Sequence, residues 1–329
     1  MTARVPVACL GAGRMGRGIA VVFAYAGHEV SVIDFRPRPA AGFDRLRTQV
    51  LDEVRRTLAT LASLGLFAPA AVEAIAARVR VVAEQEAPTA LAAAAVIFEG
   101  VPELIEVKRE VLARASKLAG PRPIFASTTS TILADAIADA IEEPRRFLNA
   151  HWLNPAFLVP LVELAPAATT DPAVTEELKR LLESIGKVPV VCAARPGYIV
   201  PRIQALAMNE AARMVEEGVA SAADIDKAIK YGFGFRFAVL GMLEFIDWGG
   251  GDILYYASRY LTRALGNSRY AAPEIIERNM REGSIGLNAG KGFFDYGALD
   301  RDAYRADRLR AFVELLGFLK PIAPPVLPE

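Results

Sequence analysis

The chain has 329 residues, of which 53% are hydrophobic and 23% are charged. A single hydrophobic core rarely grows beyond about 250–300 residues, so we expect two folded domains and little disorder. Lysine and arginine together number 38, as do aspartate and glutamate, and this balance argues against nucleic acid or a membrane surface as partner. The two cysteines lie in apolar runs and the N-terminus lacks an export signal, so we expect a soluble, cytoplasmic protein.

The first part of the chain alternates short β-rich runs with helical stretches, which is typical of a parallel sheet covered by helices. We expect strands in eight runs, at 5–11, 29–35, 78–84, 94–100, 122–128, 146–152, 158–164 and 187–193. From about Gly197, long amphipathic stretches replace these runs and indicate helices only. A Pro-Gly pair within residues 192–198 interrupts both patterns, so we place an α/β domain at 1–195 and an all-helical domain at 196–329.

A glycine-rich turn, GAGRMG, follows the first expected strand and precedes a helical run. Gly11 would allow the tight turn, Gly13 the approach of backbone N–H groups to a pyrophosphate, and Gly16 close packing of the helix. The helix dipole favours the negative phosphates, and Arg14 and Met15 would lie beside them. The alternative is an ordinary glycine-rich turn between a strand and a helix.

An acidic residue, Asp34, ends the second expected strand about 20 residues after these glycines. Its carboxylate can accept hydrogen bonds from the adenosine ribose hydroxyls and would repel a 2′-phosphate, which favours NAD over NADP. Arg36 and Arg38 follow closely and weaken that preference.

The segment 146–164 reads as strand, turn, strand, with Asn154 and Pro155 in the turn. A hairpin centred near Phe157 would place His151 opposite Glu163. The carboxylate could then orient the imidazole and leave its other nitrogen free to exchange a proton. The alternative is a histidine satisfied at a strand end, with Glu163 as a surface charge.

Hydroxyl side chains follow another strand in the run FASTTS, which contains Ser127, Thr128, Thr129 and Ser130. The carboxyl ends of strands are where α/β sheets build their sites, and a hydroxyl there could donate to a substrate oxygen. This second polar group favours catalysis over the structural interpretation of His151.

Motifs along nearly the whole chain resemble the L-3-hydroxyacyl-CoA dehydrogenase family, namely GAGRMG, FEGVPELIEVK, FASTTS, HWLNPAFLVPLVE, PGYIV, NEAARMVEEG, ADIDKAIKYGFG and GKGFFDY. The resemblance implies a Rossmann-type domain, a helical C-terminal domain that commonly dimerises, NAD as cofactor, no metal, and a role in fatty acid metabolism. It further implies His151 as general base, Glu163 as the acid that orients it, and Ser130 and Asn154 as contacts of the substrate oxygen.

The same resemblance places Glu103 and Lys108 near the nicotinamide ribose. Because ELIEVKRE also has the composition of a charged helix surface, the alternative is a solvated helix face. Where the family usually has a GFxxN run, this sequence has GYIVPR, with Pro201 in place of the asparagine. Proline is tolerated in the first turn of a helix, so the fold would survive.

The expected reaction is the NAD-dependent interconversion of a short-chain 3-hydroxyacyl-CoA and its 3-oxoacyl-CoA. The run GFGFRFAVLGMLEFIDW is closer to relatives that oxidise small hydroxy acids, such as L-gulonate or carnitine dehydrogenases, which leaves a free 3-hydroxy acid as an alternative substrate. A non-catalytic, crystallin-like NAD-binding protein is a further alternative. Arg202 and Arg236 could contact substrate, or else pack as amphipathic surface beside aromatic residues.

Overall fold

The computed structural model describes residues 4–319, and the chain divides into two compact units between Ala207 and Met208. The division falls within helix α7 (Val200–Glu216), shortly after the boundary proposed from the sequence at residues 195 and 196. Within the described residues, no helix combines the length and the apolar character needed to cross a bilayer.

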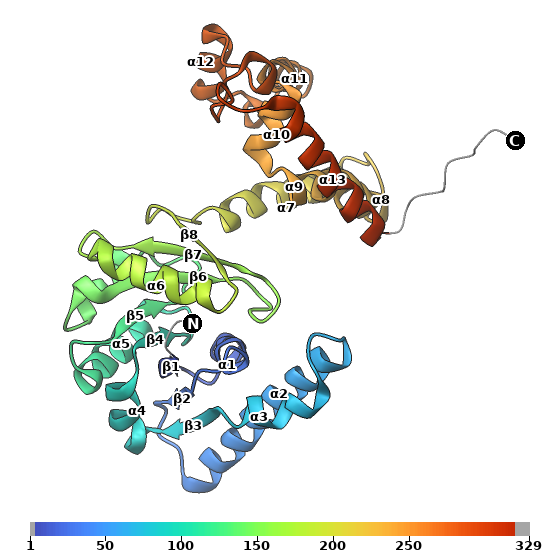
Figure 1. The fold of residues 1–329 in the computed structure, drawn as a ribbon. Helices are drawn as coiled ribbons and strands as arrows, with labels where there is room; N and C mark the ends of the chain where they lie inside the picture. Colours follow the sequence, from blue (N-terminus) through green and yellow to red (C-terminus); the bar gives the residue numbers. More distant parts are fainter. Residues whose placement is uncertain (1–3, 320–329) are drawn as a thin grey trace, which may run out of the picture. The chain divides into compact units, whose positions relative to one another are not determined.

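The first unit is built on one eight-stranded sheet with the strand order β3-β2-β1-β4-β5-β6-β7-β8 (Figure 1). Neighbouring strands are parallel except for β6 and β7. Each of the eight predicted runs contains one of these strands, which are β1 (Val7–Leu10), β2 (Val30–Asp34), β3 (Val79–Ala83), β4 (Val96–Glu99), β5 (Ile124–Ser127), β6 (Phe147–Trp152), β7 (Leu161–Pro166) and β8 (Val188–Val191). The predicted mainly parallel sheet is thus confirmed.

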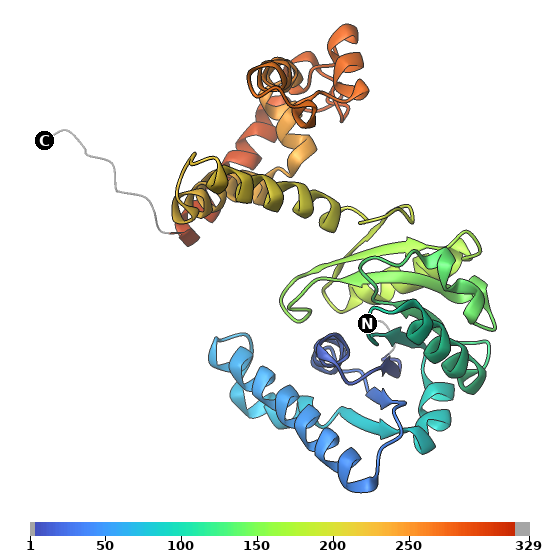
Figure 2. The ribbon, with the colours of Figure 1, turned by 180° about the vertical axis from the view of Figure 1, so that it is seen from behind.

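Helices cover both faces of the sheet, and this explains why its strands are almost continuously apolar. One face packs against α1 (Arg14–Tyr25), α2 (Ala40–Ser63), α3 (Val72–Ala76) and α6 (Pro172–Ser184), and the other against α4 (Ala87–Ala93) and α5 (Ile105–Ala119) (Figures 1 and 2). Successive side chains of β1 alternate between the two cores, Val7 and Cys9 on one side and Ala8 and Leu10 on the other.

The antiparallel pair β6 and β7 forms the predicted hairpin, and His151 lies directly opposite Glu163. Because successive side chains on a strand point to opposite faces, a shift of one residue in this register would separate the two side chains. The register is therefore the local feature that brings the imidazole and the carboxylate together.

The second unit is helical, as predicted. Beyond the end of α7 it contains α8 (Ala222–Ala228), a π-helical turn (Ile229–Gly234), α9 (Phe235–Val239), α10 (Met242–Gly249), α11 (Gly251–Ala264), α12 (Glu274–Glu282) and α13 (Arg301–Leu319). Helix α11 packs against α12, and α13 against α9 (Figure 2).

A buried carboxylate, Asp247 of α10, anchors the loop that precedes α13. It accepts hydrogen bonds from the backbone N–H groups of Phe293 and Phe294 and from the Tyr296 hydroxyl. A Cβ on Gly292 would lie 2.1 Å from this carboxylate, so only glycine allows the loop to approach so closely. This buried acid therefore links α10 to the loop before α13 within the second unit.

Candidate active site

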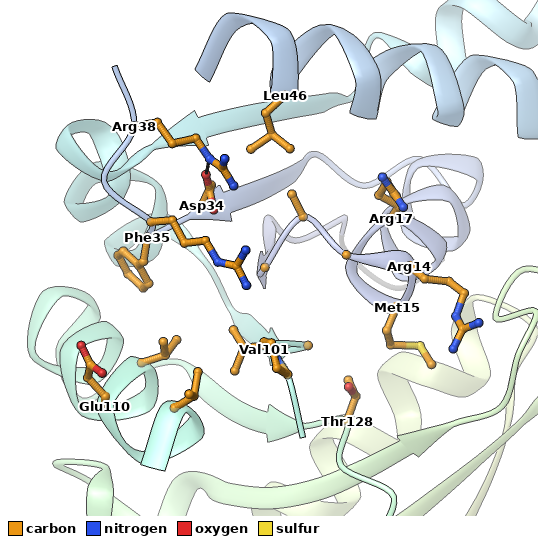
Figure 3. Close-up of a pocket in the computed structure, with 18 of the residues that line it drawn as sticks. Arg14, Met15, Arg17, Asp34, Phe35, Arg38, Leu46, Val101, Glu110 and Thr128 are labelled. Atoms are coloured by element: carbon orange, nitrogen blue, oxygen red, sulfur yellow. Dashed lines mark hydrogen bonds and ion pairs between the residues drawn. The ribbon is translucent and has the colours of Figure 1, made fainter. Parts of the chain in front are cut away.

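A cavity of about 730 Å³ lies at the carboxyl ends of the central strands (Figure 3). The strand order reverses at β1, and in open α/β sheets ligands bind beside such a reversal. We call this space the nucleotide cavity. The predicted site residues that line it are Gly11, Gly13, Arg14, Met15, Asp34, Ser130 and Asn154.

Two glycines of the turn are required by the protein's own packing. Gly11 has a φ of +97°, and a Cβ on it would lie 3.0 Å from the carbonyl oxygen of Gly100. A Cβ on Gly16 would lie 2.1 Å from the carbonyl oxygen of Gly11, so α1 could not begin so close to the turn. Gly13 differs, because its Cβ would meet only the Gly100 oxygen, at 3.8 Å. The absence of a side chain at Gly13 thus leaves open space in front of the N-terminus of α1, which suits a pyrophosphate.

The acid expected to bind ribose is in place. Asp34 ends β2, is buried, and lines the nucleotide cavity. The Arg38 Nε donates to its Oδ2 at 2.5 Å, and Figure 3 shows this guanidinium turned towards the carboxylate. Arg36 also lines the cavity, so the acid that disfavours a 2′-phosphate has two arginines beside it.

The predicted histidine and its carboxylate are in direct contact. The His151 Nδ1 lies 2.7 Å from the Glu163 Oε2, and both side chains are buried. The other carboxylate oxygen, Oε1, accepts hydrogen bonds from the backbone N–H groups of Ile199 at 2.9 Å and Val200 at 2.8 Å. Helix α7 begins at Val200, so its positive end stabilises a negative charge on Glu163. Glu163 is thus a buried carboxylate and not a surface charge.

The second imidazole nitrogen faces the predicted serine. His151 Nε2 lies 3.1 Å from the Ser130 Oγ, and Ser130 lines the nucleotide cavity together with Asn154. His151 and Glu163 lie behind this wall. The carboxylate, the imidazole and the hydroxyl therefore form a continuous chain that ends at the cavity, an arrangement able to transfer a proton to or from a bound alcohol or carbonyl.

The loop that carries Ser130 is held by Glu103. Its Oε1 accepts hydrogen bonds from the backbone N–H groups of Ser130 at 3.0 Å and Thr131 at 3.1 Å, and from both threonine hydroxyls, of Thr129 and Thr131. Burial opposes ionisation of this carboxyl group, but the hydrogen bonds from Thr129 and Thr131 and the charge of Lys108 lower its pKa to about 2. Glu103 therefore remains negatively charged over the whole neutral range.

Lys108 lies in a buried ionic cluster that the sequence did not reveal. Only 1% of its side chain is exposed, and its Nζ contacts both oxygens of the buried Glu99, at 2.9 and 3.0 Å, and one of Glu103, at 3.2 Å. Ser127 also donates to Glu99, at 2.5 Å. For Lys108 the alternative of a solvated helix face is wrong. Neither Lys108 nor Glu103 lines the nucleotide cavity; Glu103 acts on it through the loop that it holds, and Lys108 through Glu103.

Two functional candidates were missed in the sequence. Glu99 is the single acid at the end of the apolar run AAVIFEG, and an acid that ends a buried strand is a signal that could have identified it. Tyr198 is buried against His151, with ring centroids 5.2 Å apart, although nothing in its local sequence indicates that contact.

The remaining predicted residues lie outside this arrangement. Pro201 occupies the first turn of α7, as expected, where its missing N–H breaks no helical hydrogen bond. Arg202 is exposed. Arg236, in the second unit, donates to the Gly232 carbonyl and lies 4.7 Å from the Phe245 ring centroid. A substrate contact for either arginine stays a prediction.

Comparison with known proteins gives matches along most of the chain. The family model for the 3-hydroxyacyl-CoA dehydrogenase NAD-binding domain matches residues 6–195, and the model for the C-terminal domain matches residues 197–296. The chain is 31% identical, over 95% of its length and 98% of the relative's, to 5-formyl-3-hydroxy-2-methylpyridine 4-carboxylate 5-dehydrogenase of Mesorhizobium japonicum. It is 32% identical, over 88% of its length and 94% of the relative's, to 3-hydroxybutyryl-CoA dehydrogenase of Bradyrhizobium diazoefficiens.

A solved structure of 3-hydroxyacyl-CoA dehydrogenase from Archaeoglobus fulgidus superimposes with a TM-score of 0.75 at 31% identity, covering 96% of this chain and 99% of that one. Together with the family models, this similarity confirms the resemblance seen in the motifs. The chain belongs to the 3-hydroxyacyl-CoA dehydrogenase family, and it is an NAD-dependent oxidoreductase that acts on CH–OH groups.

Proposed function

We propose that this protein interconverts a short-chain 3-hydroxyacyl-CoA and the corresponding 3-oxoacyl-CoA, with His151 as the general base. The observation that carries the proposal is the buried chain from Glu163 through His151 to Ser130, with contacts of 2.7 and 3.1 Å, which ends at the nucleotide cavity. A relative that is 32% identical is a 3-hydroxybutyryl-CoA dehydrogenase, which supports this substrate class.

In the oxidising direction, the substrate hydroxyl loses its proton to Nε2 of His151, the nitrogen that faces Ser130. The negative charge of Glu163 stabilises the imidazolium that forms and holds Nδ1 as the donor. Ser130 and Asn154, both on the cavity wall, hold the substrate oxygen. A bound NAD would supply the hydride acceptor for the carbon that bears this hydroxyl, so that the alcohol could become a carbonyl.

The cofactor would be held by the turn of Gly11, Gly13 and Gly16, with Arg14 and Met15 beside it and Asp34 on the adenosine ribose. Glu103 and Lys108 would support the nicotinamide end by fixing the loop that carries Ser130. These assignments follow from position on the cavity wall or from contacts with residues on that wall.

A second candidate substrate is a small free carboxylic acid. The relative in Mesorhizobium japonicum acts on a pyridine carboxylate and matches 95% of this chain. Pro201, which stands where the family motif has an asparagine, is compatible with a changed substrate pocket. The two candidates share the proton-transfer residues and differ in whether a thioester is required.

The test is NADH oxidation by the purified protein with acetoacetyl-CoA and, at the same concentrations, with free acetoacetate and other small 3-oxo acids. We expect the thioester to be preferred, and His151→Ala to lower kcat at least a hundredfold, because general-base catalysis contributes about 10² to 10⁴ in rate. Preference for a free acid would select the second candidate. A fully active His151→Ala variant would remove His151 from the mechanism.

The two cysteines bear on the cellular location. Cys9 and Cys192 are both free thiols, and Cys9 is buried in β1. Free thiols are usual in a reducing compartment, so we propose that the protein acts in the cytoplasm. Fractionation of the native host would test this.

A further inference from the structure

We propose that Tyr198 is a positioning residue of the active site: its ring holds the imidazole of His151 and its hydroxyl holds the loop that carries Ser130. The proposal rests on the proposed function, because it assigns Tyr198 to the same proton-transfer step. Tyr198 stands where the family's GFxxN run has phenylalanine, so its hydroxyl is a feature of this chain.

The ring of Tyr198 stacks on His151. The two ring centroids are 5.2 Å apart and the planes are inclined by 30°. Glu163 binds one edge of the imidazole and Ser130 lies at the other, so both ring nitrogens are engaged and the tyrosine covers a face. Rotation of the imidazole away from the cavity would require this stacked ring to move.

The hydroxyl of Tyr198 connects two segments far apart in the sequence. It donates to the carbonyl oxygen of Thr129 at 3.1 Å and accepts from Nδ2 of Asn149 at 2.9 Å. Asn149 is buried in β6, two residues before His151, and the Thr129 carbonyl belongs to the peptide that leads into Ser130. One hydroxyl thus joins the strand of the base to the loop of the substrate-binding serine.

The backbone of Tyr198 is held in an unfavourable conformation. Its φ is +42°, and among the described residues no other non-glycine residue has a positive φ. A strained conformation of this kind persists only where the surrounding contacts determine it. Here the next two residues, Ile199 and Val200, donate their N–H groups to Glu163. The turn that positions the tyrosine therefore also positions the carboxylate.

The hydroxyl is in its donor form under working conditions. Burial raises the pKa of Tyr198 above its ordinary value, which keeps the proton on the oxygen at neutral pH. The hydrogen bond to Thr129 is therefore retained at neutral pH.

Two variants separate the roles of the ring and the hydroxyl. Tyr198→Phe keeps the ring and removes the hydroxyl, and we expect kcat to fall about tenfold while the KM for NAD stays within about twofold. Tyr198→Leu removes both, and we expect a loss of about a hundredfold in kcat. The matched control is Thr170→Val, which removes a hydroxyl-to-carbonyl hydrogen bond at the other end of β6, from Thr170 to Phe147, and should leave kcat unchanged.

A second measurement does not depend on turnover. Hydrogen–deuterium exchange should be faster in residues 128–132 of Tyr198→Phe and unchanged there in Thr170→Val. Unchanged exchange in this loop, or a wild-type kcat in Tyr198→Phe, would overturn the proposal. If the wild-type protein turned over none of the tested substrates, the proposed function would fail, and the exchange measurement alone would decide the role of Tyr198.

Discussion

Single side chains account for much of the active-site geometry, and Glu163 shows how. One of its oxygens contacts His151 and the other accepts two N–H groups at the start of α7. A buried carboxylate requires such partners, because an unpaired charge away from water is costly. Glu163 therefore supplies both a negative charge and a hydrogen-bond acceptor on each side.

Glu163→Gln removes the charge, and it also replaces the oxygen that accepts from Nδ1 of His151 by an amide NH2 group that donates. The amide oxygen can still accept the N–H groups of Ile199 and Val200, so we expect the fold to survive. The neutral side chain cannot stabilise imidazolium, and kcat should fall about a hundredfold while NAD affinity changes little. Steady-state kinetics and NADH titration measure both quantities. A variant with wild-type kcat would show that the charge of Glu163 is not used.

A second test at this scale concerns Glu103, whose pKa is lowered from 4.5 to about 2. A carboxylate whose pKa is lower in the folded state stabilises the protein above the unfolded pKa, and this stabilisation is lost as the pH falls through the folded pKa. We expect the free energy of unfolding to decrease between pH 4.5 and 2 for this reason. The side chain is 40% exposed, so solvent screening reduces the effect to about 1 kcal/mol.

Urea unfolding of the wild type and of Glu103→Gln across this pH range measures the contribution. The difference in unfolding free energy between the two proteins should shrink as the pH falls. If the difference in unfolding free energy did not change with pH, the pKa of Glu103 would be the same in the folded and the unfolded protein. Asp139→Asn provides a comparison at an exposed carboxylate, where the hydrogen bond from Arg109 also lowers the pKa of Asp139.

At the scale of an element, the start of α1 is determined by two distinct requirements. Packing within the protein requires glycine at Gly16, because a Cβ there would overlap the Gly11 carbonyl. At Gly13 a Cβ would meet no close protein atom, and we propose that the ligand is what requires glycine there. The two glycines of one motif should therefore respond differently to the same substitution.

We expect Gly16→Ala to destabilise the fold by about 2 to 4 kcal/mol, because backbone must move to accept the methyl group. Gly13→Ala should leave stability unchanged or raise it slightly, since alanine restricts the unfolded chain. It should nevertheless weaken NAD binding about tenfold by occupying the space in front of the helix. Thermal unfolding and NADH fluorescence titration distinguish the two variants. Equal losses of stability in both would contradict this division.

At the scale of the whole molecule, helix α7 exposes apolar side chains. Its 17 residues include none that is buried, and on one face of the helix Ile203 is 39% and Leu206 72% exposed. Contiguous apolar surface of this kind usually marks an interface. We propose that the protein is a homodimer and that α7 contributes to the contact.

Light scattering at micromolar concentration should give the mass of two chains, and Leu206→Arg should shift it towards one chain. Gln204→Arg, which introduces the same charge on the opposite face of this helix, serves as the control. A single-chain mass for the wild-type protein would contradict the dimer.

Local sequence determined much of this protein. The eight strands could be predicted because burial on both faces demands continuous apolar runs, and the helical unit because its apolar residues recur with helical spacing. The glycine-rich turn and the pairing of His151 with Glu163 could also be predicted, since each depends on a short segment whose geometry follows from its own residues. The domain boundary at 195 and 196 stays a prediction.

Only the tertiary structure decided how the site is supported. The sequence around Lys108 is as compatible with a solvated helix face as with a buried one. Its charge can be buried because it pairs with Glu99, which ends strand β4. Tyr198 reaches Thr129 across 69 residues of chain. Such contacts depend on which strands are neighbours in the sheet and on the path of the loops between them, and these arise from packing of the whole unit and not from any local pattern.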